Sequence, residues 1–330
     1  MAITTTEMHT GGEPVRIVES GYPPIAGDTI LDKRRYVSEY LDHLRRMLMH
    51  EPRGHFDMYG VIPVEPDLAE ADLAVLFMHN EGYSTMCGHA TIALGRYAVD
   101  RELVPKVEPE TRVVIQCPCG PVTAFVEVSE GVAGKVRFRS VGAFAHTLDN
   151  NVQVEGYGPV RYDVGYGGAY YAVADAADFG LDMRTSPARD LVDAATALTG
   201  AVRDDLVLGH PDHDDLAGLY GSILTDGVED RRPSANICVF ADAQVDRSPT
   251  GSGVTARMAL RYARGQVSLG EERTFESVVG STMTGTVVEE HKVGTLPAVV
   301  VEVGGMAYYT GSASFVAEPD DPFGTGFLVR

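Results

Sequence analysis

The sequence predicts a mixed α/β fold of the α+β kind, in two related halves that each wrap a mixed or antiparallel sheet around one helix. Three observations predict it. Runs rich in Val, Ile and Phe alternate with shorter helical runs throughout the 330 residues. Many strand-like runs follow one another as hairpins do, instead of alternating strictly with helices as in a parallel sheet. Finally, one loop-to-helix turn occurs twice, about half the chain apart.

The individual elements follow from residue type and period. β-Branched and aromatic residues favour strands, and the runs rich in them are 15–20, 72–79, 112–116, 122–128, 135–141, 236–242, 285–293 and 298–303. Apolar residues three and four positions apart predict amphipathic helices, and these runs are 36–49, 90–99, 189–202 and 253–265.

Composition excludes several classes of protein. A chain of 330 residues with 44% hydrophobic side chains can bury a large core and is long enough for two domains. With 47 acidic and 27 basic residues its net charge is −20, which argues against a nucleic acid or an anionic membrane as partner. The amino terminus lacks the features of a secretory signal, and no apolar run approaches the roughly 20 residues that cross a bilayer. We therefore expect a cytoplasmic protein with reduced cysteines.

The repeated turn predicts a duplicated domain. Cys87-Gly88 and Thr250-Gly251 each end a loop and open an apolar helix, and 250 minus 87 places them 163 positions apart. If the two halves face each other, two helix amino termini point into one cleft. Their unpaired N–H groups and positive ends suit a carboxylate.

Cys87 is the candidate nucleophile or base. A helix amino terminus lowers a thiol pKa from about 8.5, because it favours the thiolate. The alternative is a buried apolar filler, as free cysteines often are; the neighbouring Gly88 and His89 and the second turn favour chemistry. Asp246 precedes Thr250 by four residues and is either a turn residue or a partner for a substrate ammonium, and Pro249 stiffens the approach.

Two other patterns are interpreted as structural. Cys117 and Cys119 form a C-x-C pair, but no second Cys/His pair lies at zinc-like spacing, so we expect a turn or core role. Cys238 is expected in the core. The loop HPDHDD at 210–215 resembles a metal cluster, yet an acidic solvated loop explains it better. No metal site is predicted.

Seven motifs together resemble the proline racemase family. They are MHTGGEPVR (8–16), EPRGH (51–55), DMYG (57–60), MCGH (86–89), YGGAYYA (166–172), DRSPTGSG (246–253) and SVVGSTMTG (277–285). The similarity runs to the DDPFGTGF tail. It implies a fold like diaminopimelate epimerase, with two pseudo-symmetric domains, the substrate between them, no cofactor and a homodimer. The expected domains are 1–133 plus 305–330, with Cys87, and 134–304, with Thr250.

The resemblance also assigns residues. Racemases and epimerases of this family carry a cysteine in both turns, whereas this chain has Thr250 in the second. That pairing is typical of members that dehydrate trans-3-hydroxy-L-proline, which are hydro-lyases. Position by position, Cys87 becomes the base and Thr250 its counterpart. The implied substrate contacts are Gly88, His89, Asp246, Gly251 and Ser252, and the implied aromatic walls are Tyr59 and Phe240. The family motifs leave open whether His9, Glu51, Arg53 and His55 line the cleft or brace it.

Physical chemistry favours the same activity. Racemisation needs an acid that returns a proton to carbon on the far face, and an alcohol is too weak for that at neutral pH. A carbanion formed by Cys87 must instead lose its β-hydroxyl as water, giving pyrroline-2-carboxylate. The 3-hydroxyl and the Cα hydrogen share one ring face, so elimination is syn, with Cys87 or His89 protonating the hydroxyl. The alternatives are a hydroxyproline 2-epimerase or proline racemase, a cysteine hydrolase using Cys87, and a non-catalytic amino-acid binder.

Overall fold

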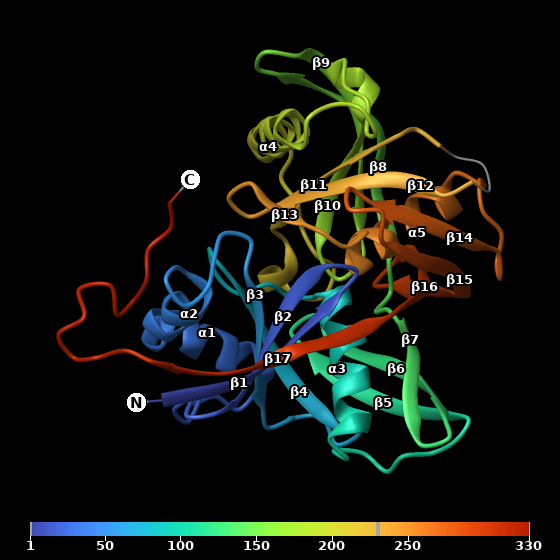
Figure 1. The fold of residues 1–330 in the computed structure, drawn as a ribbon. Helices are drawn as coiled ribbons and strands as arrows, with labels where there is room; N and C mark the ends of the chain where they lie inside the picture. Colours follow the sequence, from blue (N-terminus) through green and yellow to red (C-terminus); the bar gives the residue numbers. More distant parts are fainter. Residues whose placement is uncertain (1, 229–231, 330) are drawn as a thin grey trace. The chain divides into compact units, whose positions relative to one another are not determined.

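The computed structural model describes residues 2–228 and 232–329. They form two compact units, Met1–Val136 with Met306–Arg330, and Arg137–Gly305. Both units are mixed sheets with few helices, so the predicted fold class is confirmed (Figure 1). None of the helices in the described part of the chain is long and apolar enough to span a membrane.

The first unit is a mixed sheet closed around one helix. Its elements are β1 (Ala2–Thr10), β2 (Glu13–Ser20), α1 (Ile30–Tyr40), α2 (Asp42–Met49), β3 (Tyr59–Val64), β4 (Leu73–His79), α3 (Gly88–Asp100), β5 (Glu110–Cys117), β6 (Gly120–Ser129), β7 (Val132–Arg139, which leads into the second unit) and β17 (Ala307–Val316). The strands pair in the order β17-β1-β2-β3-β4-β5-β6, and β2–β3 and β4–β5 are the parallel pairs in it. Helix α3 packs against strands from both ends of this order, so the sheet curls around it.

The second unit repeats this arrangement. Its elements are β8 (Phe144–Val154), β9 (Gly158–Tyr166), β10 (Tyr170–Asp175), α4 (Ala188–Asp205), β11 (Leu219–Thr225), β12 (Ser234–Phe240), β13 (Gln244–Asp246), α5 (Gly251–Ala263), β14 (Glu272–Ser277), β15 (Thr282–Val293) and β16 (Leu296–Gly305), with 3-10 turns at Ala176–Phe179 and Asp214–Leu216. The order is β8-β9-β10-β11-β12-β14-β15-β16, with β10–β11 and β12–β14 parallel. Helix α5 contacts β8 to β10 and β15 to β16.

The two units share one sequence of pairings. In each, two antiparallel pairs are followed by a parallel, an antiparallel, a parallel and an antiparallel pair. The central helix enters at the same step, since α3 follows β4 and α5 follows β12 with its short partner β13. Nearly every residue of both helices is buried, and each helix is enclosed by strands of its own unit.

The helix predicted over 36–49 is wrong in its bounds. The structure has two helices there, because Leu41 ends α1 and precedes α2 with non-helical backbone angles (φ −121°, ψ 10°). Helix α1 also begins earlier, at Ile30. Thr29 and Asp32 bond each other's backbone N–H groups in a capping box, which fixes that start.

Arg53 anchors the carboxy-terminal tail of the first unit. Its guanidinium donates to the carbonyl of Val316 (2.7 Å) and of Phe323 (3.1 Å) and pairs with Asp321 (2.7 Å). The N–H of Phe327 donates to the carbonyl of Glu51 at 3.0 Å. The EPRGH motif therefore braces the tail at both of these residues.

We expect Arg53→Ala to free the tail beyond Val316, because three hydrogen bonds to it are lost together. Limited proteolysis should cleave residues 317–329 several-fold faster in this variant than in the wild type, while the rest of the chain stays resistant. Arg53→Lys, which can reach only part of this set, should be intermediate. Equal cleavage of the alanine variant and the wild type would show that the tail is held by other contacts.

Candidate active site

Cys87 caps helix α3. Its backbone is extended (φ −146°, ψ 109°), and its sulfur accepts the N–H of Ala90 at 3.4 Å. The carbonyl of Cys87 accepts from the N–H and the hydroxyl of Thr91, at 3.0 and 2.7 Å. The side chain is buried, and Gly88 begins the helix behind it. The sulfur is thus held at the amino terminus of the helix, beside its first N–H groups.

His89 lies beside that sulfur. Nδ1 of His89 lies 3.1 Å from Sγ of Cys87, and Nε2 lies 3.6 Å away. The carbonyl of His89 accepts from the hydroxyl of Thr10 on β1 at 2.8 Å. The ring of Tyr59 meets the imidazole edge to face, with centroids 4.8 Å apart. These contacts bring three predicted site residues, Cys87, His89 and Tyr59, into one buried group within the first unit.

The other cysteines lie where sequence reasoning placed them. Cys117 and Cys238 are fully buried, Cys119 lies in the turn after β5, and all are free thiols. Burial, and then the neighbouring thiols of Cys119 and Cys87, raise the pKa of Cys117. It therefore stays protonated and unreactive. Among residues 2–228 and 232–329, three or more metal-ligating side chains do not gather at any point, including 210–215.

Thr250 occupies the matching cap of helix α5 in a different way. Its φ is +68°, a conformation that β-branched residues rarely adopt and that costs about 1–3 kcal/mol. Its side chain makes no cap bond, and within the described residues its buried hydroxyl has no hydrogen-bond partner. The sulfur of Cys87 caps its own helix, whereas the Thr250 hydroxyl is left to bind something else.

The loop before Thr250 is tightly braced. One carboxylate oxygen of Asp246 accepts the N–H of Ser248 at 2.7 Å, and the hydroxyl of Ser248 accepts the N–H of Thr250 at 3.1 Å. All three side chains are buried. Asp246 is therefore not the exposed turn residue of the alternative interpretation, and its position is fixed relative to Thr250.

An aromatic row continues the second group. Phe240 stacks on Tyr220 (centroids 5.2 Å apart), and Tyr220 meets Tyr171 edge to face at 5.8 Å. The hydroxyl of Tyr171 hydrogen-bonds that of Ser252 at 2.7 Å, and burial raises the pKa of Tyr171, so it stays protonated. The backbone of Gly167 packs directly against that of Ser252, since a Cβ on Gly167 would lie 2.2 Å from the carbonyl oxygen of Ser252. Glycine is required at that position.

The predicted residues thus form two groups, one in each unit. Cys87, Gly88, His89 and Tyr59 belong to the first; Asp246, Thr250, Gly251, Ser252 and Phe240 belong to the second. His9 and His55 join neither group. Both line a surface hollow of about 490 Å³ in the first unit, where His9 stacks on Tyr308 and accepts the N–H of Gly12.

Sequence reasoning missed two members of the second group, Tyr171 and Tyr220. Tyr171 stood inside the quoted motif YGGAYYA, which was the available signal. Neighbouring strands carry the two rings, and the register of β10 on β11 brings them together. Such a register is not readable from the local sequence.

A buried histidine beneath Tyr59 gives a testable pH dependence. His79 stacks on Tyr59 at 6.1 Å and its Nδ1 accepts the N–H of Glu81 at 3.2 Å. Burial, and then the charges of Arg45 and Arg34, lower its pKa from 6.5 to about 3. The unfolded chain therefore binds more protons between pH 6.5 and 3, and the stability that His79 contributes as a neutral ring is lost as pH falls through that window.

We expect His79→Asn, whose amide oxygen can replace Nδ1, to weaken this dependence. Between pH 6.5 and 5 the wild type should lose about 1.6 kcal/mol of unfolding free energy through His79 alone, and the variant should be spared that loss. Urea unfolding at the two pH values measures it. His43, an exposed histidine, provides the control variant His43→Asn. The same loss in the wild type and in His79→Asn would contradict the assignment.

Comparison with known proteins places the chain among related sequences. The family model described as proline racemase matches residues 5–328. The trans-L-3-hydroxyproline dehydratase of Xenopus tropicalis is 57% identical over 332 residues, which cover 99% of this chain and 95% of that protein. A 3-hydroxyproline 2-epimerase of Burkholderia multivorans is 44% identical over 330 residues, covering 100% and 98%.

Solved structures agree on the fold. The crystal structure of a hydroxyproline epimerase from Agrobacterium vitis, with bound trans-4-hydroxy-L-proline, superimposes with a TM-score of 0.94 at 27% identity. The match covers 99% of this chain and 95% of that one.

Proposed function

The chain belongs to the proline racemase family, and we propose that it dehydrates trans-3-hydroxy-L-proline to pyrroline-2-carboxylate and water. One observation carries this proposal. Two matching helix caps hold unlike atoms: a sulfur beside an imidazole at Cys87, and at Thr250 a hydroxyl without a hydrogen-bond partner in the part of the chain that the structure describes. A pair of this kind can remove a proton from carbon but cannot return one to the opposite face. The high identity to proteins named as dehydratases of this substrate supports the same activity.

In the first step, the thiolate of Cys87 takes the Cα hydrogen of the substrate as a proton. The amino terminus of α3, which the sulfur caps, stabilises the negative charge of the thiolate before the step. The electron pair left on Cα is adjacent to the substrate carboxylate. The positive amino termini of α3 and α5 are suited to bind this carboxylate. Gly88 and Gly251, the first residues of those helices, let the backbone come close to it.

In the second step, the C3–O bond breaks and the electron pair on Cα forms the C2=C3 double bond. The hydroxyl takes a proton and leaves as water, which balances the proton removed in the first step. The hydroxyl and the Cα hydrogen lie on one ring face, so a single group of residues serves both steps. The 3.1 Å separation of Cys87 Sγ and His89 Nδ1 supports a relay in which either one returns the proton. The enamine product then tautomerises to the imine in solution.

The remaining residues bind and orient the substrate in this proposal. Asp246 receives the ring ammonium, Ser252 contributes a hydrogen bond, and Tyr59 and Phe240 enclose the ring. Thr250 meets the ring face opposite Cys87 and bonds the substrate without exchanging a proton with carbon. The two units serve as the two predicted domains of the enzyme, and no cofactor takes part. That the enzyme is a cytoplasmic homodimer stays a prediction.

Product analysis in deuterated water tests the proposal. The protein is incubated separately with trans-3-hydroxy-L-proline, trans-4-hydroxy-L-proline and L-proline, and each mixture is followed by proton NMR. Only the 3-hydroxy compound should be consumed, giving pyrroline-2-carboxylate. Deuterium at Cα with inversion in the other two would instead establish an epimerase or racemase. Unchanged substrates in all three mixtures would favour a non-catalytic amino-acid binder.

A further inference from the structure

The conformation of Thr250 is not held by its own side chain. A φ of +68° is unfavourable for a β-branched residue, and the Thr250 hydroxyl makes no cap bond that would offset the cost. Such a conformation persists only when surrounding contacts fix it. The contacts that do so lie on the Pro249–Thr250 peptide group.

This peptide group is held at both ends. Its N–H donates to the hydroxyl of Ser248 at 3.1 Å, and its carbonyl, on Pro249, accepts from Nδ2 of Asn236 at 3.3 Å. The plane of the peptide is therefore fixed. φ of Thr250 is the rotation between that plane and the rest of the residue, whose own carbonyl accepts the N–H of Val254 at 2.7 Å as the first bond of α5. Because both sides of this rotation are held, φ is limited as well.

Asn236 in turn is oriented by Arg257. Nη1 of Arg257 donates to Oδ1 of Asn236 at 2.9 Å, and Asn236 is 1% exposed. A primary amide can present either its oxygen or its NH₂ group to a neighbour. The guanidinium can only donate, so it pairs with the amide oxygen, and the NH₂ group must face the carbonyl of Pro249. Without Arg257 the amide can turn over and lose the bond to Pro249.

Arg257 is an unusual residue to bury for stability alone. It is 4% exposed on α5, its guanidinium donates to neutral oxygens of Asn236 and of Ser234 (2.5 Å), and it lies 4.7 Å from the ring centroid of Phe275. Ser234 donates to Asp226 at 3.0 Å, so the carboxylate acts through one hydroxyl. Burial, and then the charge of Arg261, lower the pKa of Arg257 to about 9, which leaves it protonated at neutral pH. Burying a cation in this way costs stability.

We propose that Arg257 is a positioning residue for the reaction: through Asn236 it fixes the Pro249–Thr250 peptide and thereby directs the Thr250 hydroxyl. The inference rests on the proposed function, since it assigns Thr250 to the substrate. It adds to that function a residue that does not touch the substrate.

Asn236→Asp is the first test. Its carboxylate still accepts from Arg257, as an ion pair, but has no N–H to give to Pro249. We expect an unchanged or higher melting temperature together with a kcat for dehydration about 10- to 100-fold lower, and little change in KM. A purely structural role instead predicts an unchanged kcat, because the packing and the bond to Arg257 are kept. Wild-type kcat in this variant would overturn the proposal.

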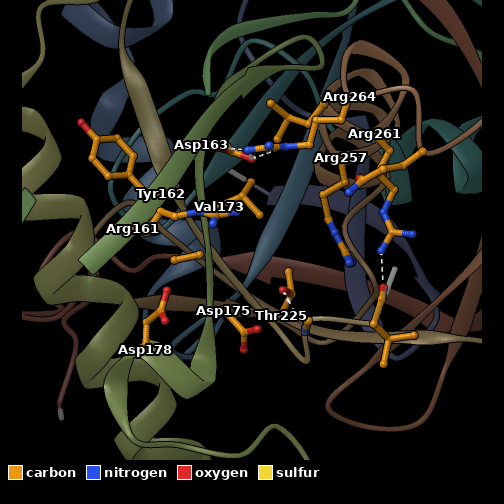
Figure 2. A pocket seen from close by; sticks show the side chains of 15 residues that line it. Arg161, Tyr162, Asp163, Val173, Asp175, Asp178, Thr225, Arg257, Arg261 and Arg264 are labelled. Atoms are coloured by element: carbon orange, nitrogen blue, oxygen red, sulfur yellow. Dashed lines mark hydrogen bonds and ion pairs between the residues drawn. The ribbon is translucent and has the colours of Figure 1, made fainter. Parts of the chain in front are cut away.

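Arg257→Ala gives a second test by chemical rescue. Figure 2 shows Arg257 and Arg261 on one helix, lining a cavity of about 290 Å³ in the second unit. Free guanidinium can enter through this cavity and take the place of the missing group. Millimolar guanidinium should raise the kcat of Arg257→Ala several-fold and should leave the kcat of Asn236→Asp unchanged. Arg261→Ala is the matched control, because Arg261 shares the helix and the Phe275 ring but donates to the carbonyl of Val228.

The wild type, assayed beside the variants, separates failure of this inference from failure of the proposed function. Lack of dehydratase activity in the wild type would refute the function only. Crystal structures of the wild type and of Asn236→Asp report φ of Thr250 independently of any assay. The inference predicts a changed φ in the variant, and an unchanged value near +68° would overturn it.

Discussion

Cys87→Ser is expected to lower kcat for dehydration of trans-3-hydroxy-L-proline by about 10²- to 10⁴-fold while leaving the fold intact, because an alcohol does not ionise near neutral pH and cannot accept the Cα proton. Serine is also a preferred N-cap, better suited than cysteine to accept the N–H of Ala90. The variant should therefore be at least as stable as the wild type. This separates the chemical role of the sulfur from its structural one.

Substrate binding distinguishes this expectation from simple damage to the site. Isothermal titration should show that Cys87→Ser still binds trans-3-hydroxy-L-proline, since the other proposed contacts remain. Cys119→Ala is a suitable control, because that thiol lies in a turn of the same unit and should not affect kcat. An active serine variant would remove Cys87 from the mechanism.

Thr250→Cys has the second large expected effect, a gain of activity. In the proposed mechanism a thiol at this cap protonates carbon on the face opposite Cys87, so the variant should exchange and invert the Cα centre of L-proline or trans-4-hydroxy-L-proline. Cysteine is not β-branched and should tolerate the φ of +68° at least as well as threonine. Chiral chromatography after incubation in deuterated water should detect the inverted, labelled product only in the variant.

Thr250→Ser is the control for the gain of epimerisation. It keeps the oxygen and removes the methyl group, so it should remain a dehydratase without epimerase activity. If Thr250→Cys and Thr250→Ser behave alike, the choice between dehydration and epimerisation does not depend on whether sulfur or oxygen stands at this position. The acid on the second face must then be sought elsewhere in the second unit.

The sequence was most informative where a residue type determines local geometry. Helices α3 and α5 were predicted to within two residues of their starts, because in both a loop ending in Cys87-Gly88 or Thr250-Gly251 is followed by an apolar run. The position of Cys87 at the amino terminus of α3 was predicted from the same turn. The break at Leu41 was not visible, because the apolar pattern continues across it. Strand β17 was also missed: it is exposed along most of its length, and pairing with β1 rather than its own pattern makes it a strand.

The features of the candidate site that escaped prediction are those set by tertiary contacts. In our proposal the left-handed backbone of Thr250 depends on a nearby residue, Ser248, and on Asn236, which lies on another strand of the unit. The bond between Tyr171 and Ser252 joins residues 81 positions apart. No local propensity encodes either arrangement, because each depends on strand register and on where α5 begins.

The common order of strand pairing has a consequence for the history of the protein. A unit that buries its own central helix is a complete core, so a gene of half this length could have encoded a protein that folded unaided. Duplication and fusion would then have released the two copies from identical constraints. One copy could keep its sulfur while the other exchanged it for oxygen, so on the proposed mechanism a single codon change at position 250 would separate two reaction classes. Sorting related genes by that codon should therefore divide them by chemistry more faithfully than overall similarity does.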